Sequence, residues 1–120
     1  MFNSIALVGG THGNETSGIQ LIRNWQQFGL PSRFNELNVS LSIANEAAIA
    51  ANVRFVDEDL NRQFTFEGLS NNNSAKEAEL AKALNQQLGP KGDSNTDFVI
   101  DIHNTTSEMG ATLIILEADE

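Results

Sequence analysis

The chain has 120 residues, which is enough for one small domain and too few for two ordinary ones. Hydrophobic residues make up 40% of it, so a core is possible, while a formal net charge of −9 argues against nucleic acid or an anionic membrane surface as a partner. There is no cysteine, which excludes a disulfide framework and thiol chemistry. With neither a signal-peptide pattern nor an apolar stretch of transmembrane length, we expect a cytoplasmic protein.

The sequence IALVGGTHGNE at residues 5–15 predicts a strand followed by a tight turn. Residues 5–8 form a compact apolar run, and the glycines after them tolerate backbone conformations that other residues avoid. Apolar residues then recur at helical spacing over residues 16–28, before a glycine and a proline that end the helix. His12 and Glu15 therefore lie in a loop between a strand and a helix, where open α/β sheets bind ligands.

His12 and Glu15 have two interpretations on this stretch alone. An imidazole and a carboxylate are both zinc ligands, and a catalytic zinc site uses three protein ligands plus water. Alternatively, His12 is an ordinary loop residue, and Glu15 favours the helix start as a cap or through the helix dipole. The two interpretations weigh about equally for so short a motif, and a third ligand is needed to separate them.

The middle of the chain predicts a strand, a long loop and a helix. Residues 37–44 alternate apolar and small polar side chains, as a strand does, and a short helical turn is expected over residues 47–51. Residues 52–73 mix charged, aromatic and asparagine residues with no sustained period, and long ordered loops of this kind tend to be functional. Helical spacing returns over residues 74–88, with Ser74 as the expected N-cap.

Two further strands are expected, at residues 98–102 and 111–116, joined by a polar turn. Strands thus alternate with helices along most of the chain. This order predicts an α/β fold with a mostly parallel or mixed sheet and helices on both faces. A helix that would cover the last strand is not part of the sequence, so we expect a truncated fold.

His103 is the other histidine of the chain, and it directly follows the strand predicted at residues 98–102. If the two strand ends are parallel neighbours, His12, Glu15 and His103 come together as a zinc site. Asp101 lies two residues earlier on the same face of the strand and is a candidate hydrogen-bond partner for His103. The alternative is that His103 is a hydrogen-bonded histidine at the end of a strand, without a ligand.

Arg54, Asn61 and Arg62 lie close together in the long loop of an otherwise acidic chain. Guanidinium groups bind carboxylates bidentately, and an amide adds a further donor, so these residues are candidates for binding an acidic substrate. The acidic residues at 57–59 offer an alternative, because they would pair with the arginines in an exposed network that contributes little stability.

Three motifs occur in order along the chain: GGTHGNE at residues 9–15, DLNR at 59–62 and DIHNTTSEMGATLIIL at 101–116. Together they resemble the aspartoacylase branch of the aspartoacylase/succinylglutamate desuccinylase family, which are zinc hydrolases with a carboxypeptidase-like fold. The resemblance covers essentially the whole chain. It implies that His12 and Glu15 bind zinc together with His103.

The same resemblance implies roles for residues outside the ligand set. Arg54 would bind substrate, and Asn61 and Arg62 would hold the carboxylates of an N-acyl amino acid such as N-acetyl-aspartate. Two more residues, Asn104 and Thr105, would line the pocket. The acidic residues that would support the site are Asp59 and Asp101.

The chain also departs from the family pattern. In the family, the glutamate that acts as general base lies beyond the strand of the second histidine, and neither Glu108 nor Glu117 matches its motif. We therefore expect residues 1–120 to be the N-terminal zinc-binding part of the catalytic domain, with the remainder outside this chain. Apolar surface would then be exposed where that remainder packs, and self-association into a homo-oligomer would follow.

Three functions remain open from the sequence. The first is zinc-dependent hydrolysis of the amide bond of an N-acyl amino acid, with N-acetyl-aspartate as substrate. The second is a desuccinylase or another acylase that acts on a related dicarboxylic substrate. The third is a metal-binding part without catalysis, because the general base has no counterpart in the chain. All three take a small molecule or a metal ion as the partner, and none takes a nucleic acid or a membrane.

Overall fold

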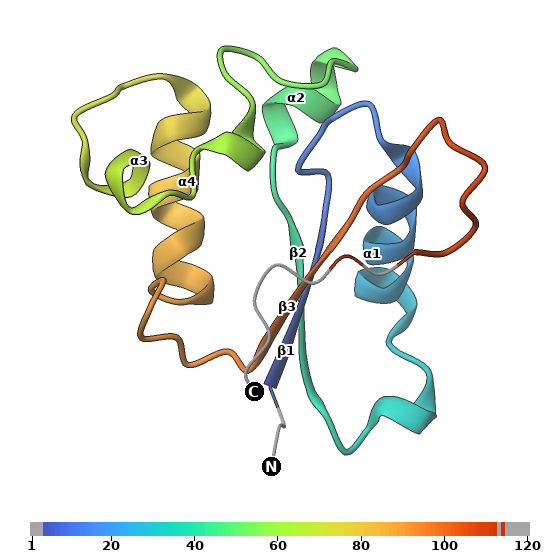
Figure 1. Cartoon of the computed structure of the whole chain (residues 1–120). Helices are drawn as coiled ribbons and strands as arrows, with labels where there is room; N and C mark the ends of the chain where they lie inside the picture. The colour runs from blue at the N-terminus through green and yellow to red at the C-terminus, as the bar shows by residue number, and fades with distance from the viewer. Residues whose placement is uncertain (1–3, 113, 115–120) are drawn as a thin grey trace.

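A parallel three-stranded sheet forms the centre of the computed structural model, which describes residues 4–112 and 114. The strand order is β2–β1–β3, and both pairs are parallel. The strands are β1 (Ser4–Gly9), β2 (Asn38–Ile43) and β3 (Phe98–Ile102). Figure 1 shows α1 (Thr16–Phe28) on one side of the sheet and α4 (Lys76–Leu88) on the other. The predicted α/β fold, with a parallel sheet and helices on both faces, is confirmed.

The helix that follows β1 has the bounds predicted for it. It ends at Gly29, whose φ of 85° is accessible to glycine and whose N–H donates to the Trp25 carbonyl oxygen at 2.9 Å. Its buried face packs on the carboxyl end of β1 without intervening side chains, because a Cβ on Gly9 would lie 2.6 Å from the carbonyl oxygen of Gly18. This close approach brings the start of α1 to the end of the sheet that carries His12.

The long loop predicted at residues 52–73 is only partly irregular. It contains the 3₁₀ turn η2 (Leu60–Arg62) and the short helix α3 (Phe66–Ser70). Thr65 caps α3, since its Oγ1 accepts a hydrogen bond from the Gly68 N–H at 3.0 Å. Elements of three to five residues are shorter than two helical turns, so they show no hydrophobic period in the sequence.

The short elements α2 (Glu46–Ala51) and η1 (Ser32–Phe34) complete the helical part. The predicted N-cap of α4 is wrong, because the helix begins at Lys76 and Ser74 lies two residues outside it. The Lys76 N–H donates instead to a carboxylate oxygen of Asp57, at 2.9 Å. A side chain from the preceding loop thus replaces the local cap.

The core on the α4 side joins the sheet to the loop and to α4. Its buried members are Val8, Ala44, Leu60, Ala81 and Leu84. Leu60 belongs to the DLNR motif and is completely buried, so the motif is anchored in the core by its leucine. The neighbouring side chains Asn61 and Arg62 are exposed.

Among the described residues β3 is an edge strand, and its apolar side chains are poorly covered. Phe98, Val99 and Ile100 are 47%, 51% and 41% exposed, although strands of parallel sheets are normally covered on both faces. Exposed apolar surface was expected from the sequence, and it lies here. Of the strand predicted at residues 111–116, the described residues 111, 112 and 114 are not in a strand, and the others lie outside the described part.

The helices of the described ranges do not include one with the length and apolar character needed to cross a membrane.

Candidate metal centre

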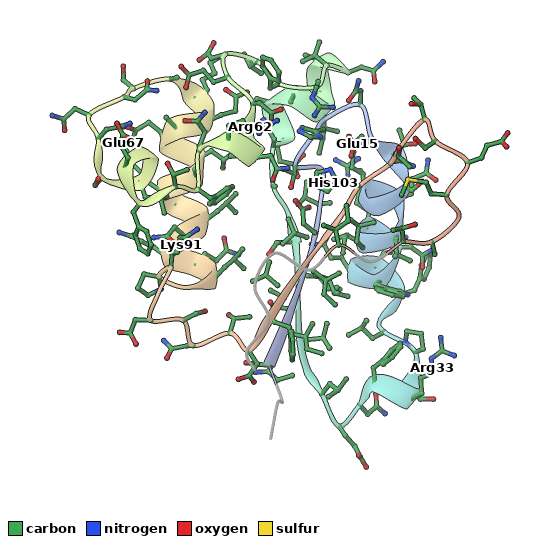
Figure 2. All side chains as sticks on the ribbon, in the orientation of Figure 1. Glu15, Arg33, Arg62, Glu67, Lys91 and His103 are labelled. Carbon is green, nitrogen blue, oxygen red and sulfur yellow. The ribbon has the colours of Figure 1, made fainter. Side chains whose placement is uncertain are left out.

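His12, Glu15 and His103 meet at the carboxyl end of the sheet. Gly9, the last residue of β1, is paired with Ile102, the last of β3, so the segments that follow the two strands emerge side by side. Figure 2 shows Glu15 and His103 at this end of the molecule. Potential ligand atoms of the three side chains lie within 4.8 Å of one another. The structure therefore brings together the three residues predicted as zinc ligands.

Glu15 bridges the two histidines. Its Oε1 lies 2.8 Å from Nδ1 of His12, and its Oε2 lies 2.8 Å from Nδ1 of His103. The Asn104 N–H donates to Oε2 at 3.0 Å. Burial is the largest single influence on the pKa of Glu15 and raises it, but the Asn104 amide and the two histidines together hold that pKa below its usual value. Glu15 is therefore ionised, as a metal ligand must be.

The capping role considered for Glu15 is not the one observed. Glu15 occupies the N-cap position of α1, yet its side chain makes no capping hydrogen bond. The first turn of α1 is bound instead by Asn104, whose Oδ1 accepts from the Ser17 N–H at 3.1 Å and whose Nδ2 donates to the Ser17 hydroxyl at 2.7 Å. The Glu15 carboxylate is thereby left to face the histidines.

Each histidine is held from its far side by an aspartate. Nε2 of His12 lies 2.9 Å from Oδ1 of Asp59, and Nε2 of His103 lies 2.8 Å from Oδ2 of Asp101. Asp101 also accepts a hydrogen bond from the Thr11 hydroxyl at 2.8 Å. An ionised carboxylate only accepts, so Nε2 of each ring is placed to donate to its aspartate, while Nδ1 faces Glu15 at the shared centre. Such carboxylate–histidine pairs orient and strengthen metal ligands.

Arg54 is the predicted substrate residue that touches this cluster. Its guanidinium lies 3.4 Å from Oδ2 of Asp59 and 3.8 Å from Oε1 of Glu15. The burial of Asp59, the largest single influence, raises its pKa, but His12, the Asn61 amide and Arg54 together hold that pKa below its usual value. The predicted pairing of the loop's acidic residues with its arginines is thus observed between Asp59 and Arg54.

The other acidic residues of that loop do not pair with the arginines. Asp57 binds the start of α4, and Glu58 accepts a hydrogen bond from Asn73 at 2.9 Å. Arg62 is exposed, lies at the same end of the molecule as Glu15, and its guanidinium has no partner among the described residues (Figure 2). Asn61 binds Asp59 through its backbone N–H, which leaves its amide side chain exposed.

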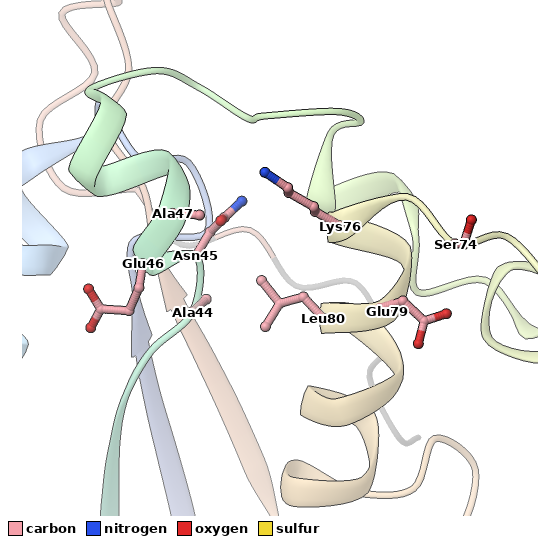
Figure 3. Close-up of a pocket in the computed structure, with 8 residues that line it drawn as sticks. All are labelled: Ala44, Asn45, Glu46, Ala47, Ser74, Lys76, Glu79 and Leu80. Atoms are coloured by element: carbon pink, nitrogen blue, oxygen red, sulfur yellow. The ribbon is translucent and has the colours of Figure 1, made fainter.

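Two cavities differ in what lines them. One, of about 380 Å³, lies beside Glu15 and Arg54 and is also lined by the predicted pocket residues Asn104 and Thr105. The other, of about 520 Å³, lies between the start of α2 and α4 and contains none of the three candidate ligands (Figure 3). The smaller cavity is therefore the one that adjoins the cluster and the predicted substrate residues.

A family model described as the succinylglutamate desuccinylase/aspartoacylase catalytic domain matches residues 2–119. The chain belongs to this family. The desuccinylase/aspartoacylase resemblance drawn from the three motifs is thereby confirmed.

Relatives of this chain carry more than one name. A probable aspartoacylase of Trichodesmium erythraeum (strain IMS101) is 45% identical over 116 residues, which are 95% of this chain and 39% of that protein. The N-acyl-aromatic-L-amino acid amidohydrolase (carboxylate-forming) of Xenopus laevis is 40% identical over 120 residues, 98% of this chain and 39% of that protein. The chain thus spans about two fifths of the length of these curated relatives.

Solved structures of the family share this fold. Murine aminoacylase 3 superposes with a TM-score of 0.77 at 39% identity, over 88% of this chain and 36% of that chain. The succinylglutamate desuccinylase of Chromobacterium violaceum superposes with a TM-score of 0.68 at 23% identity, over 85% of this chain and 33% of that chain. The second likeness supports the fold alone.

The donor set of this aspartoacylase-family chain fits a zinc ion. Two imidazole nitrogens and one carboxylate oxygen are a known ligand set of catalytic zinc, with a fourth position left for water or substrate. His12 is almost fully buried, at 3% exposure, while His103 and Glu15 are partly open toward solvent. The cluster therefore combines a buried candidate ligand with access from outside.

Metal binding to this centre is expected to release a proton from His103. Asp101, chiefly through its hydrogen bond, raises the pKa of His103 to about 9 against the opposing effect of burial, and Glu15 adds to the rise. At about pH 7 the metal-free ring is therefore protonated, and it must lose that proton to become a ligand. Calorimetric zinc titrations in two buffers of different ionisation enthalpy measure the protons released.

Asp101→Asn is the variant to compare in this titration, because it removes the main cause of the raised pKa of His103. We expect fewer protons from this variant than from the unaltered chain, although Glu15 still raises the pKa of His103. An equal number from both proteins would contradict the assignment of His103 as a protonated ligand.

Two residues near the centre were not found from the sequence. Thr11 lies inside the first motif and binds Asp101, 90 positions away, so no local spacing connects them. Glu77 lies on α4, where an acidic residue in the first turn is ordinarily an exposed partner of the helix dipole. Only its complete burial marks it as different.

Proposed function

We propose that this chain is the N-terminal, zinc-binding part of an amidohydrolase that cleaves the amide bond of an N-acyl amino acid. The observation that carries the proposal is the cluster of His12, Glu15 and His103 at the carboxyl end of the sheet. The names of the relatives, aspartoacylase and N-acyl-aromatic-L-amino acid amidohydrolase, support the reaction class. N-acetyl-aspartate is the proposed substrate, and the proposal is supported by the first relative, which is named a probable aspartoacylase.

The chain's own residues would bind the metal and the substrate. His12, Glu15 and His103 hold zinc, while Asp59 and Asp101 keep the two rings oriented. At such a site a zinc ion would act as a Lewis acid toward the acyl oxygen, and it would lower the pKa of a bound water to about 7.

The substrate side of the proposal rests on the two arginines of the loop. Arg62 is free to bind a carboxylate of the substrate bidentately, and Arg54 lies near enough to the cluster to stabilise negative charge on the acyl oxygen. Asn61, Asn104 and Thr105 would complete the contacts around the substrate.

Hydrolysis also needs a group that moves a proton from water to the leaving amine, as the C–N bond breaks and the new C–O bond forms. We place this general base outside residues 1–120, in the part of the catalytic domain that the relatives have beyond this match. The chain covers 39% of the first two relatives, so most of their length lies there.

Zinc content, measured with N-acetyl-aspartate hydrolysis on the same sample, tests the proposal. One zinc per chain without turnover supports the ligand set and a general base outside the chain. One zinc with turnover supports the reaction but means that a residue of this chain supplies the base, and Glu108→Gln would then be examined. No zinc after reconstitution would refute the metal centre.

A second substrate class has its own support. Relatives named for aromatic N-acyl amino acids are about as similar as those named aspartoacylase, at 40% against 45% identity. Comparing N-acetyl-aspartate with N-acetyl-phenylalanine and N-succinyl-glutamate, by binding to the zinc-loaded protein, separates the candidates. Preference for the aromatic substrate would replace N-acetyl-aspartate and leave the reaction class unchanged.

Replacing Arg62 with alanine is expected to weaken N-acetyl-aspartate binding by roughly 10- to 100-fold, because hydrogen bonds to charged groups contribute about 1.5–3 kcal/mol. Binding to the zinc-loaded protein is the measurement, so the result does not depend on turnover. Arg33→Ala is the matched control, since Arg33 lies at the opposite end of the molecule and stacks on Phe34 (Figure 2). Equal affinity in both variants would remove Arg62 from the substrate site.

A further inference from the structure

Glu77 is a fully buried carboxylate with no cationic partner among the residues that the structure describes. Its exposure is 0%, and it is one of the three largest completely buried side chains. It lies on the first turn of α4, next to the exposed start of that helix. Burying a charge is costly unless hydrogen bonds replace the lost water, so an isolated carboxylate at this place requires strong donors.

The donors come mainly from three consecutive backbone amides of the long loop. The N–H groups of Val56, Asp57 and Glu58 all donate to the Glu77 carboxylate, those of Asp57 and Glu58 at 3.1 and 3.2 Å to Oε2. Burial, the largest single influence, raises the pKa of Glu77, but these donors and Asn45 together hold that pKa below its usual value. Glu77 is thus an ionised side chain that holds a loop backbone.

The segment that Glu77 holds lies between two residues of the metal centre. Arg54 precedes Val56 by two positions, and Asp59 directly follows Glu58. The loop also binds the helix in return, because the Asp57 carboxylate accepts a hydrogen bond from the first N–H of α4. The Arg54 carbonyl oxygen also accepts from the Gly13 N–H at 3.2 Å, so the segment touches the histidine loop.

Asn45 connects the same carboxylate to the end of β1. Its Nδ2 donates to Oε1 of Glu77 at 3.3 Å, and its Oδ1 caps α2 by accepting from the Ala48 N–H at 3.2 Å. Its own N–H donates to the Gly10 carbonyl oxygen at 3.0 Å. Figure 3 shows Asn45 at the start of α2, facing the first turns of α4. Glu77 therefore joins the two chain segments that carry His12 and Asp59.

We propose that Glu77 is a positioning residue of the metal centre, which acts by fixing residues 56–58 so that Asp59 is held against Nε2 of His12 and Arg54 against Glu15. The proposal rests on the proposed function, since it assigns Glu77 to the same zinc site. Glu77 itself touches neither the candidate ligands nor the substrate side of the cluster.

Glu77→Gln tests this assignment, with Glu79→Gln as the matched control on the same helix. The glutamine keeps the size of the side chain but places an NH₂ group beside the backbone N–H donors. An NH₂ group cannot accept a hydrogen bond from them. Glu79 is 62% exposed, and within the described part of the chain its carboxylate pairs only with Lys82, so its replacement should change little. The measurements are amide hydrogen exchange, zinc affinity and the NMR signal of the His12 ring N–H.

In Glu77→Gln we expect amide exchange of residues 56–58 to rise about tenfold or more while β1 and α1 stay protected. Zinc affinity should fall by roughly 10- to 100-fold, the effect of losing the support of a ligand. The His12 ring N–H signal, which depends on Asp59, should shift or exchange faster. Faster exchange at 56–58 with unchanged zinc affinity and an unchanged ring signal would overturn the proposal.

The exchange measurement needs neither metal nor turnover, so it separates this proposal from the proposed function. If the unaltered protein binds no zinc, the proposed function fails; Glu77 is then judged by the loop amides and the His12 ring signal. If Glu77→Gln does not fold, Glu77→Asp serves, because it keeps the charge but withdraws it by one methylene group. Exchange that rises only at residues 56–58, with weaker zinc binding, supports positioning, whereas uniform loss of protection would show a general stabilising role and overturn it.

Discussion

Replacing His12 with alanine is expected to abolish stoichiometric zinc binding. His12 is the most buried of the three candidate ligands, and its ring is held on one side by Glu15 and on the other by Asp59. A catalytic zinc site has only three protein ligands, so the loss of one leaves an incomplete set. Elemental analysis of the purified variant after reconstitution, beside the unaltered chain, is the measurement.

Two further variants show whether the loss is specific. Asp59→Asn keeps all three ligands but weakens the hydrogen bond to Nε2 of His12, so we expect zinc affinity to fall by roughly 10- to 100-fold without vanishing. Glu46→Gln removes an exposed carboxylate whose one partner among the described side chains is Arg23, and it should bind zinc as the unaltered chain does. Retention of one zinc per chain in His12→Ala would refute the ligand assignment.

Replacing Gly13 with alanine is expected to destabilise the fold by about 3 kcal/mol or more, near the upper end of the usual overpacking range, and to lower Tm by about 10 °C. A Cβ at this position would lie 2.2 Å from the carbonyl carbon of Ala48 and 2.4 Å from the Ile49 nitrogen. Both atoms belong to the backbone of α2, which cannot yield as a flexible side chain would. Thermal unfolding followed by circular dichroism is the measurement.

Gly29→Ala is the matched control for Gly13→Ala. A Cβ at Gly29 would meet no atom within 4 Å, so its cost comes only from the backbone conformation, with φ 85° and ψ 161°, and should be about 1–3 kcal/mol. Gly13→Ala should also weaken zinc binding, since Gly13 follows His12 and its N–H binds the Arg54 carbonyl. Equal stability of the two variants would mean that α2 can move away from the histidine loop.

Local sequence patterns were sufficient for much of the sheet and for the three candidate ligands. The apolar run before the glycines, the helical spacing of the next segment and the second apolar strand predicted β1, α1 and β3 with bounds close to those observed. His12 and His103 each follow one of these strands, so the direction of the strands was enough to bring them to one edge. Such patterns are local in sequence, which is why they are readable without the fold.

Asp101 beside His103 was predicted from the period of the strand and is observed, but the other supporting contacts of the centre could not be predicted in this way. Asp59 reaches His12 across 47 positions and Thr11 reaches Asp101 across 90, and neither pair has a spacing that marks it. The N-cap of α4 shows the same limit. Ser74 is a residue type that favours the N-cap position, but the Asp57 side chain from the loop accepts a hydrogen bond from the first N–H of the helix instead. Which of several suitable side chains reaches a donor depends on how the loop packs.

The sequence alone thus determined the family, the α/β class, and the identity of the histidines and the glutamate that form the cluster. The tertiary structure decided how these groups are held: Asp59 behind the His12 ring, Asn104 rather than Glu15 as the cap of α1, and the buried Glu77 behind the loop. The physical reason is that residue types and strand ends can be recognised within short segments of sequence. The burial of a carboxylate and its hydrogen-bond partners arise only when distant segments pack together.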